Sequence, residues 1–394
     1  MMSVKQTVTA LEGARDQIRS IPLGNIANIA KQAFNNTDII PLWFGEGDLA
    51  TPDFISDAIC KALKEGKTFY SHQNGIPEFR QALADYLTKL NEKPVSLDRI
   101  TVTSGGMPAI MKAVQLTVNE GDNVIVIDPV WPNITGIVQM VGAESRSVSM
   151  DLTARGWELD VAKVEAACDA RTKAIFFASP GNPTGAVIPV EVKKQLLELS
   201  RKTGIWIISD EVYSRMSYDI DVVPSFLDIS EEEDRVLIIN SFSKSWSMTG
   251  ARLGWLVHPP SLEKTIAMMV QYTTSGTTTF LQYGGIAALR HGEDYVKFMS
   301  DYCREGMKIV CDALDEIPRV ILRRRPEAGM YAFFEIDGMT ESRKACLDIL
   351  DSSKVGLAPG YFFGKQSEKF LRLCYCRSPE QLHMAMERLK KTLR

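Results

Sequence analysis

The feature of this sequence that most constrains its fold is a set of short apolar runs, most of them rich in β-branched residues. Their hydrophobicity is nearly continuous, as expected of strands that are covered on both faces. Helical patterns lie between several of them, at Pro108–Asn119, Asp160–Ala167 and Val190–Lys202. This alternation predicts an α/β fold with a mostly parallel central sheet. The candidate strands are Ile100–Thr103, Asn123–Ile127, Ala174–Ala178, Trp206–Ser209, Val236–Asn240 and Leu253–Val257.

The pattern changes in the last third of the chain. Long charged helices are predicted at Gly292–Leu314 and Pro379–Leu393, with short strands at Met330–Glu335 and Phe370–Tyr375. We therefore expect a large α/β domain over residues 50–285 and a smaller α+β domain over residues 286–394. Residues 1–49 are too few for a domain of their own. We expect them to form an N-terminal arm and part of the small domain.

The charge balance and the rare residue types exclude several kinds of partner. The formal net charge is −4, which gives no reason to expect nucleic acid or an anionic membrane surface. Seven scattered cysteines without a C-x-x-C pair favour a reducing cytoplasm, and four widely spaced histidines make a metal site improbable. The sequence contains neither an apolar signal core near its start nor a run of eighteen apolar residues.

A glycine pair follows the first candidate strand, in Thr103-Ser104-Gly105-Gly106-Met107-Pro108. Glycines allow a sharp turn, and the helix that follows offers unpaired N–H groups to an anion. Pro108 suits the first turn of that helix. The motif therefore predicts a phosphate-binding loop, although an ordinary strand-to-helix turn has the same appearance.

Two further motifs follow candidate strands. Ser179-Pro180-Gly181-Asn182-Pro183-Thr184-Gly185 forms a rigid loop at a strand end, where ligand crevices of α/β sheets lie. Asp210-Glu211-Val212-Tyr213 places an acid at the end of a buried strand, where it requires a partner such as a cationic ring nitrogen. A stiff turn and a helix cap are the alternative interpretations of these two motifs.

The fourth motif carries a lysine and an arginine in Ser241-Phe242-Ser243-Lys244-Ser245-Trp246-Ser247-Met248-Thr249-Gly250-Ala251-Arg252-Leu253-Gly254-Trp255. Ser241, Ser243 and Arg252 could together hold a dianionic phosphate, with Arg252 supplying a bidentate fork. A partly desolvated lysine near other cations has a lowered pKa, which favours reaction with an aldehyde. The position of Lys244 after a buried strand argues against an ordinary surface lysine.

These four motifs, in this order, resemble the class I and II aminotransferases of fold type I. The resemblance extends from Phe44-Gly45-Glu46-Gly47-Asp48-Leu49-Ala50-Thr51-Pro52, which is similar to the family's G-E-P-D-F-x-T-P, to Phe370-Leu371-Arg372-Leu373-Cys374-Tyr375. Gly47 and Leu49 depart from the family's pattern. The resemblance implies a fold type I transferase that uses pyridoxal 5'-phosphate.

Roles for individual residues follow from the resemblance alone. Lys244 would form the Schiff base and carry the catalytic proton, and Asp210 would pair with the ring nitrogen. Tyr213 and Asn182 would bind the phenolic oxygen, and Trp131 would stack on the ring. Gly105, Gly106, Met107, Ser241, Ser243 and Arg252 would surround the phosphate.

The same resemblance implies a substrate site and a partner. Arg372 would bind the substrate carboxylate, with help from the backbone of Gly45, and Trp131 and Asn182 would border the substrate. Tyr70 would reach the phosphate of a neighbouring subunit. The active protein would then be a homodimer with shared active sites.

The implied activity is transfer of an amino group between an amino acid and a 2-oxo acid by a ping-pong mechanism. Met107 replaces a lysine that some aspartate- and prephenate-using relatives carry, so we expect a neutral or aromatic amino acid as one substrate. Two alternatives remain open at this point. One is a carbon–sulfur β-lyase or related lyase or synthase of the same fold, and the other is a non-enzymatic effector-binding domain.

Overall fold

The computed structural model describes residues 10–21, 25–31 and 36–393. Its centre is a seven-stranded sheet in the order β2-β10-β9-β8-β7-β3-β4, and β10 runs antiparallel to both neighbours. This arrangement confirms the predicted α/β fold with a mostly parallel sheet. The strands are β2 (Ile100–Thr103), β3 (Asn123–Asp128), β4 (Glu144–Ser149), β7 (Thr172–Ala178), β8 (Trp206–Asp210), β9 (Val236–Ser241) and β10 (Gly254–Val257).

All six strands named from the sequence are present within two residues of their expected bounds. The strand of this sheet that the sequence analysis did not predict is β4, the edge strand Glu-Ser-Arg-Ser-Val-Ser, in which Val148 is the buried residue. An edge strand with polar side chains carries little of the hydrophobic signal that marks central strands.

Helices cover both faces of this sheet, which explains why its strands are apolar throughout. In β7, Ile175 and Phe177 pack into one hydrophobic core, while Ala174 and Phe176 pack into the core on the other face. The surrounding helices are α3 (Asp53–Lys64), α4 (Pro77–Asn91), α5 (Gly106–Thr117), α6 (Asn133–Met140), α7 (Val161–Ala167), α8 (Val190–Thr203), α9 (Glu263–Gln271) and α10 (Thr279–His291).

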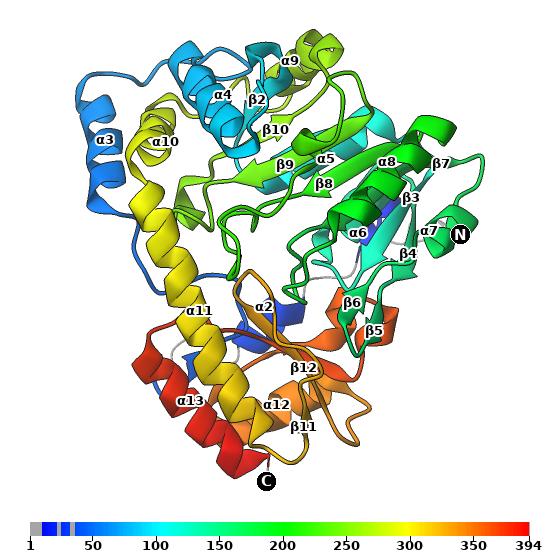
Figure 1. The fold of residues 1–394 in the computed structure, drawn as a ribbon, viewed down its shortest axis with the longest axis vertical. Coiled ribbons are helices and arrows are strands. Elements are labelled where there is room, and N and C mark those ends of the chain that lie inside the picture. The colour runs from blue at the N-terminus through cyan, green and yellow to red at the C-terminus, as the bar shows by residue number, and fades with distance from the viewer. Residues whose placement is uncertain (1–9, 22–24, 32–35, 394) are drawn as a thin grey trace, which may run out of the picture.

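A second sheet has the strand order β11-β12-β15-β14, and its strands are β11 (Val320–Ile321), β12 (Tyr331–Ile336), β14 (Ala358–Pro359) and β15 (Phe370–Cys374). Its hydrophobic core includes residues of α11 (Glu293–Asp315), α12 (Ser342–Ser353) and α13 (Pro379–Thr392). Helix α11 descends from α10 beside the large sheet to α12 and α13, and therefore connects the two cores (Figure 1).

Part of the N-terminal region packs into the core of the second sheet. Ile26 and Ile29 of α2 (Asn25–Lys31) belong to that core, and β1 (Ile40–Pro41) pairs with β13 (Val355–Gly356). The preceding α1 (Asp16–Arg19) contacts α6, and β5 (Asp151–Thr153) and β6 (Gly156–Glu158) form a hairpin. The domain limits at residues 49/50 and 285/286 stay predictions.

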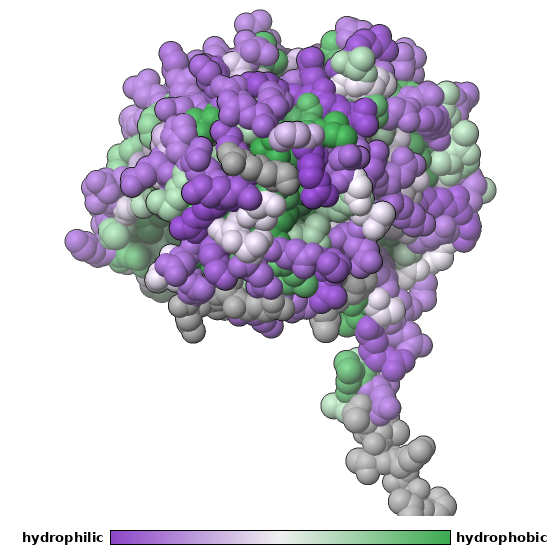
Figure 2. All heavy atoms as spheres, turned by 90° about the horizontal axis from the view of Figure 1, so that it is seen from below, coloured by the Kyte–Doolittle hydropathy of each residue, from purple (hydrophilic) through white to green (hydrophobic). Residues whose placement is uncertain are grey.

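The surface carries scattered apolar groups. On the face seen from below, hydrophilic residues predominate and hydrophobic residues form small separate groups (Figure 2). None of the helices in the described ranges is long and apolar enough to cross a membrane. Among the same residues, no group of His, Cys, Asp and Glu side chains is arranged to hold a metal ion.

Candidate active site

A cavity of about 350 Å³ lies where strands of the large sheet end, and it brings together residues far apart in the sequence. The strand register explains this convergence, because Ala178 lies opposite Asp210 and Gly254 lies opposite both Ser241 and Thr103. Twelve of the residues singled out from the sequence line the cavity: Gly45, Gly106, Met107, Trp131, Asn182, Asp210, Tyr213, Ser241, Ser243, Lys244, Arg252 and Arg372.

Lys244 follows β9, and its Nζ donates a hydrogen bond to the carbonyl oxygen of Gly45. Burial lowers the pKa of the Lys244 amine, although the nearby Glu46 carboxylate acts in the opposite direction. A lowered pKa increases the fraction of neutral amine, which is the form that attacks an aldehyde carbon.

Asp210 is the last residue of β8, and its Oδ1 accepts a hydrogen bond of 3.1 Å from the backbone N–H of Val212. Burial raises the pKa of Asp210 to about 6, against the attraction of Lys244. The carboxylate is therefore destabilised here, and a cationic group beside it would stabilise its ionised form.

The predicted phosphate loop meets the guanidinium of Arg252. Gly105 has a φ of +100°, and a Cβ at this position would lie 2.7 Å from Nη2 of Arg252. Only glycine combines this backbone conformation with so close an approach. Arg252 Nη1 also donates a hydrogen bond of 2.8 Å to the carbonyl oxygen of Thr249. The loop, the first turn of α5 and the arginine thus form one concave, cationic corner.

Arg372 lies fully buried on β15 among aromatic rings. Its guanidinium carbon is 4.4 Å from the ring centre of Tyr331 and 4.9 Å from that of Phe363. Nη1 donates to Oδ1 of Asn182 over 2.9 Å and Nη2 donates to the carbonyl oxygen of Trp43, while Nε has no hydrogen-bond partner among the described residues. No acidic side chain of the described ranges forms an ion pair with Arg372. A buried cation without a paired acid is suited to an anionic ligand.

Trp131 forms a wall of the cavity beside this arginine. Its ring centre is 5.6 Å from the guanidinium carbon of Arg372 and 6.3 Å from the ring centre of Phe363. The backbone N–H of Val130 donates to the carbonyl oxygen of Phe363 over 2.8 Å, which holds the segment that carries Trp131 against the second sheet.

Two predicted residues lie outside the lining of the cavity. Gly105 precedes the lining residue Gly106 and lies against Arg252, whereas Tyr70 is 91% exposed and lies in a separate hollow with residues 274–280. The sequence analysis missed Glu46 and Tyr331, which line the cavity, and Phe363, which holds Arg372. Glu46 stands in a motif that the resemblance already covered, whereas nothing in the sequence distinguishes Tyr331 or Phe363 from core aromatics.

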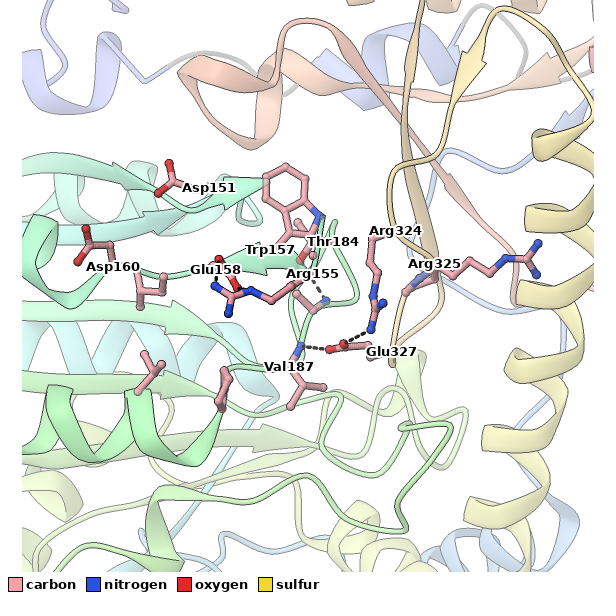
Figure 3. A pocket seen from close by; sticks show the side chains of 16 residues that line it. Asp151, Arg155, Trp157, Glu158, Asp160, Thr184, Val187, Arg324, Arg325 and Glu327 are labelled. Carbon is pink, nitrogen blue, oxygen red and sulfur yellow. Dashed lines mark hydrogen bonds and ion pairs between the residues drawn. The ribbon is translucent and has the colours of Figure 1, made fainter. Parts of the chain in front are cut away.

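A second cavity, of about 490 Å³, lies between the β5–β6 hairpin and the segment 324–327 (Figure 3). Its charged side chains already have ion-pair or hydrogen-bond partners in the protein. Arg155 pairs with Glu158 at 2.7 Å, and Glu327 lies between Arg324 at 3.3 Å and the backbone N–H of Val187 at 3.1 Å. It contains none of the site residues predicted from the sequence.

Comparisons with known proteins show the family to which this chain belongs. Residues 38–389 match the family model for aminotransferase class I and II. The probable aspartate/prephenate aminotransferase of Aquifex aeolicus is 34% identical over 363 residues, which cover 90% of this chain and 91% of that protein.

Solved structures are similar over nearly the whole chain. The aspartate aminotransferase of Thermotoga maritima superposes with a TM-score of 0.89 at 31% identity, covering 96% of this chain and 99% of that one. The alanine aminotransferase of Pyrococcus furiosus superposes with a TM-score of 0.90 at 25% identity, with the same coverage of 96% and 99%. This chain therefore belongs to the class I and II aminotransferases, a family of enzymes that depend on pyridoxal phosphate.

Proposed function

We propose that this aminotransferase transfers an amino group from a neutral amino acid, aliphatic, thioether or aromatic, to a 2-oxo acid by a ping-pong mechanism. The observation that carries the proposal is the lining of the cavity. Of its described residues, three are cationic, Lys244, Arg252 and Arg372, and each has a task with cofactor or α-carboxylate. No further cation lines the described cavity to receive a second carboxylate.

The residues of the cavity fit pyridoxal phosphate. The corner formed by Gly105, Gly106 and Arg252 offers backbone N–H groups and a guanidinium to a phosphate, with the Ser241 and Ser243 side chains beside it. The raised pKa of Asp210 is the behaviour of a buried carboxyl that has room for a cationic partner such as a pyridinium nitrogen.

Lys244 has two tasks in this proposal. Its amine would attach the cofactor covalently, and the same Nζ, when free, would take the proton from the substrate Cα. Tethering a neutral amine beside that proton gives it a high effective concentration. The bound cofactor supplies the sink for the electron pair that remains on Cα. Asp210 would keep the ring nitrogen protonated, and Tyr213 and Asn182 would hold the phenolic oxygen.

The α-carboxylate is proposed to bind Arg372, assisted by the backbone N–H of Gly45. The free Nε and the buried, unpaired charge of Arg372 support this role. Aromatic rings on its faces leave the edge of the guanidinium as the direction of approach, which favours a bidentate contact.

The wall for the substrate side chain is apolar. It includes Phe44, Met107, Ile110, Val130 and Ile134. Glu46, which accepts a hydrogen bond from the Thr249 hydroxyl, adds a negative charge at the same cavity, so a second carboxylate would be repelled as well as desolvated. Arg19 of α1 forms an ion pair with Asp16 and does not line the cavity.

We propose further that the protein is a homodimer with shared active sites. Phe69 and Tyr70 are 83% and 91% exposed and line one hollow with residues 274–280, and Tyr272, two residues before that segment, is 83% exposed. Large aromatic side chains that are this exposed support an interface with another subunit. The seven free thiols support a reducing compartment such as the cytoplasm.

A half-reaction tests the proposed function. Phenylalanine, methionine or alanine, each added alone to the holoenzyme, should decrease the absorption of the cofactor at roughly 420 nm and increase it at roughly 330 nm. The corresponding 2-oxo acid should appear in stoichiometric amount. Release of ammonia and pyruvate from a sulfur-containing amino acid, with an unchanged cofactor spectrum, would instead identify a lyase.

A further inference from the structure

Tyr331 lies where the cofactor side and the substrate side of the cavity meet. It is the first residue of β12 and is 1% exposed. Its hydroxyl oxygen is 2.7 Å from that of Tyr213, and the two rings meet edge to face at 80° with their centres 5.8 Å apart. The Tyr331 hydroxyl also lies close to Gly45: a Cβ atom at position 45 would be only 2.0 Å from the hydroxyl oxygen.

The ring of Tyr331 cannot move freely. The Arg372 guanidinium lies 4.4 Å from its centre on one side, and a strand pairing joins Tyr331 to Cys374 on the neighbouring β15. The hydroxyl is therefore held at one point, between Gly45 and Tyr213.

The hydrogen bond between the two tyrosines has a direction that the proposed function fixes. Each hydroxyl carries one proton. If Tyr213 donates its proton to the phenolic oxygen of the cofactor, then Tyr331 must donate to Tyr213. Burial raises the pKa of both tyrosines far above the ordinary value, so both keep their protons at any working pH.

We propose that Tyr331 is a positioning residue whose hydroxyl orients Tyr213 and strengthens the hydrogen bond that Tyr213 donates to the cofactor. Hydrogen bonds in a chain polarise one another, so the donor at the end of the chain is stronger than an isolated one. This inference rests on the proposed role of Tyr213.

The same core contains a matched pair outside the cavity. The hydroxyl oxygens of Tyr218 and Tyr375 are also 2.7 Å apart, and Tyr218 donates to the carbonyl oxygen of Gly329 over 2.9 Å. Because Tyr218 uses its proton for Gly329, Tyr375 must donate to Tyr218, and the pair has the same arrangement as Tyr331 and Tyr213. Tyr375 is fully buried and does not line the cavity, so it provides a control for removal of a hydroxyl alone.

The test is a pH titration of the visible absorption of the lysine-bound cofactor in the holoenzyme. A donor at the phenolic oxygen stabilises its negative charge and so lowers the pH midpoint at which the linkage loses its proton. Tyr331→Phe, which keeps the ring against Arg372, should raise that midpoint by about half a unit or more, the effect of losing one ordinary hydrogen bond. Tyr375→Phe should leave it within about 0.1 unit.

A double-mutant cycle separates this inference from the proposed function. Tyr213→Phe alone should raise the midpoint, and Tyr331→Phe added to Tyr213→Phe should cause no further rise, because the hydroxyl acts through Tyr213. If Tyr213→Phe has no effect, the proposed role of Tyr213 fails. If Tyr213→Phe raises the midpoint but Tyr331→Phe does not, or raises it equally in both backgrounds, the inference about Tyr331 is wrong. Cofactor affinity should change by less than about threefold in Tyr331→Phe, because the phosphate contacts are untouched.

Discussion

Arg372 of β15 donates a hydrogen bond of 2.9 Å to Oδ1 of Asn182, in the loop that follows β7. This contact joins the small sheet to the edge of the large one at the cavity. It uses the amide oxygen of Asn182, a residue that lines the cavity, so the amide NH2 group is the part of this side chain left to act as a donor. The residue proposed to bind the substrate carboxylate and a residue proposed to bind the cofactor are therefore positioned by each other.

Arg372→Lys should lower kcat/KM by about a hundredfold or more for both the amino acid and the 2-oxo acid, because lysine offers one charge point and no bidentate fork. Steady-state kinetics with both substrates measures this effect. Arg388→Lys is a suitable control, since Arg388 is outside the cavity and binds the carbonyl oxygen of Asp38. An equal loss in both variants would indicate general destabilisation.

Lys244→Ala should abolish multiple turnovers while still binding the cofactor through the phosphate corner and Asp210. Only an amine at this position can attach the cofactor and move the Cα proton. Borohydride reduction of the wild-type holoenzyme should fix the cofactor to the peptide that contains Lys244. Lys202→Ala, at an exposed lysine on α8, should retain turnover. Ordinary turnover of Lys244→Ala would mean that another lysine does the chemistry.

Asp210 should make the apoprotein less stable as the pH rises. Burial raises its pKa from 3.8 to about 6, so the folded apoprotein binds this proton more tightly than the unfolded chain. The contribution of this group to stability is complete below the unfolded pKa and is lost as the pH rises through the folded pKa. Urea unfolding of apoprotein and of its Asp210→Asn variant should give free energies whose difference changes by about 1.4 kcal/mol between pH 5 and 7.5. A constant difference would mean that the carboxyl titrates normally.

The apolar wall predicts the selectivity for the amino donor. With a common 2-oxo acid, kcat/KM should be higher for phenylalanine, methionine or alanine than for aspartate, because a second carboxylate would be desolvated near Met107 and repelled by Glu46. Met107→Lys should improve the ratio for aspartate over methionine by about tenfold or more. If aspartate exceeds all three in the wild type by more than about a hundredfold, roughly 2.7 kcal/mol, then a cation does reach the side-chain pocket.

Tyr70 should act in the active site of the neighbouring subunit. Tyr70→Phe should weaken cofactor binding by about tenfold to a hundredfold, the range expected for a lost hydrogen bond to a charged group. Hybrid dimers of Lys244→Ala and Tyr70→Phe subunits should contain one complete site and show more activity than either parent. A fully active monomer in sedimentation at assay concentration would contradict the shared site.

The sequence by itself determined the central sheet and most of the site. Buried strands such as β7 are apolar on both faces, so a continuous apolar run in the sequence identifies them. The edge strand β4 has polar side chains and therefore lacks such a run. Lys244, Asp210 and Asn182 were identifiable because they lie at the end of such strands or a few residues after it, and the ends of neighbouring parallel strands lie at one edge of a sheet.

The tertiary structure alone decided what surrounds these residues. Tyr331 and Phe363 are far from Tyr213 in sequence, and as aromatic residues in apolar segments they have the same pattern as any core residue. Their contacts with Arg372 and with the Tyr213 hydroxyl depend on how the second sheet packs against the first. A local pattern records which side chains are buried, but packing between distant segments decides which buried side chains touch, because those contacts form only when the two sheets come together.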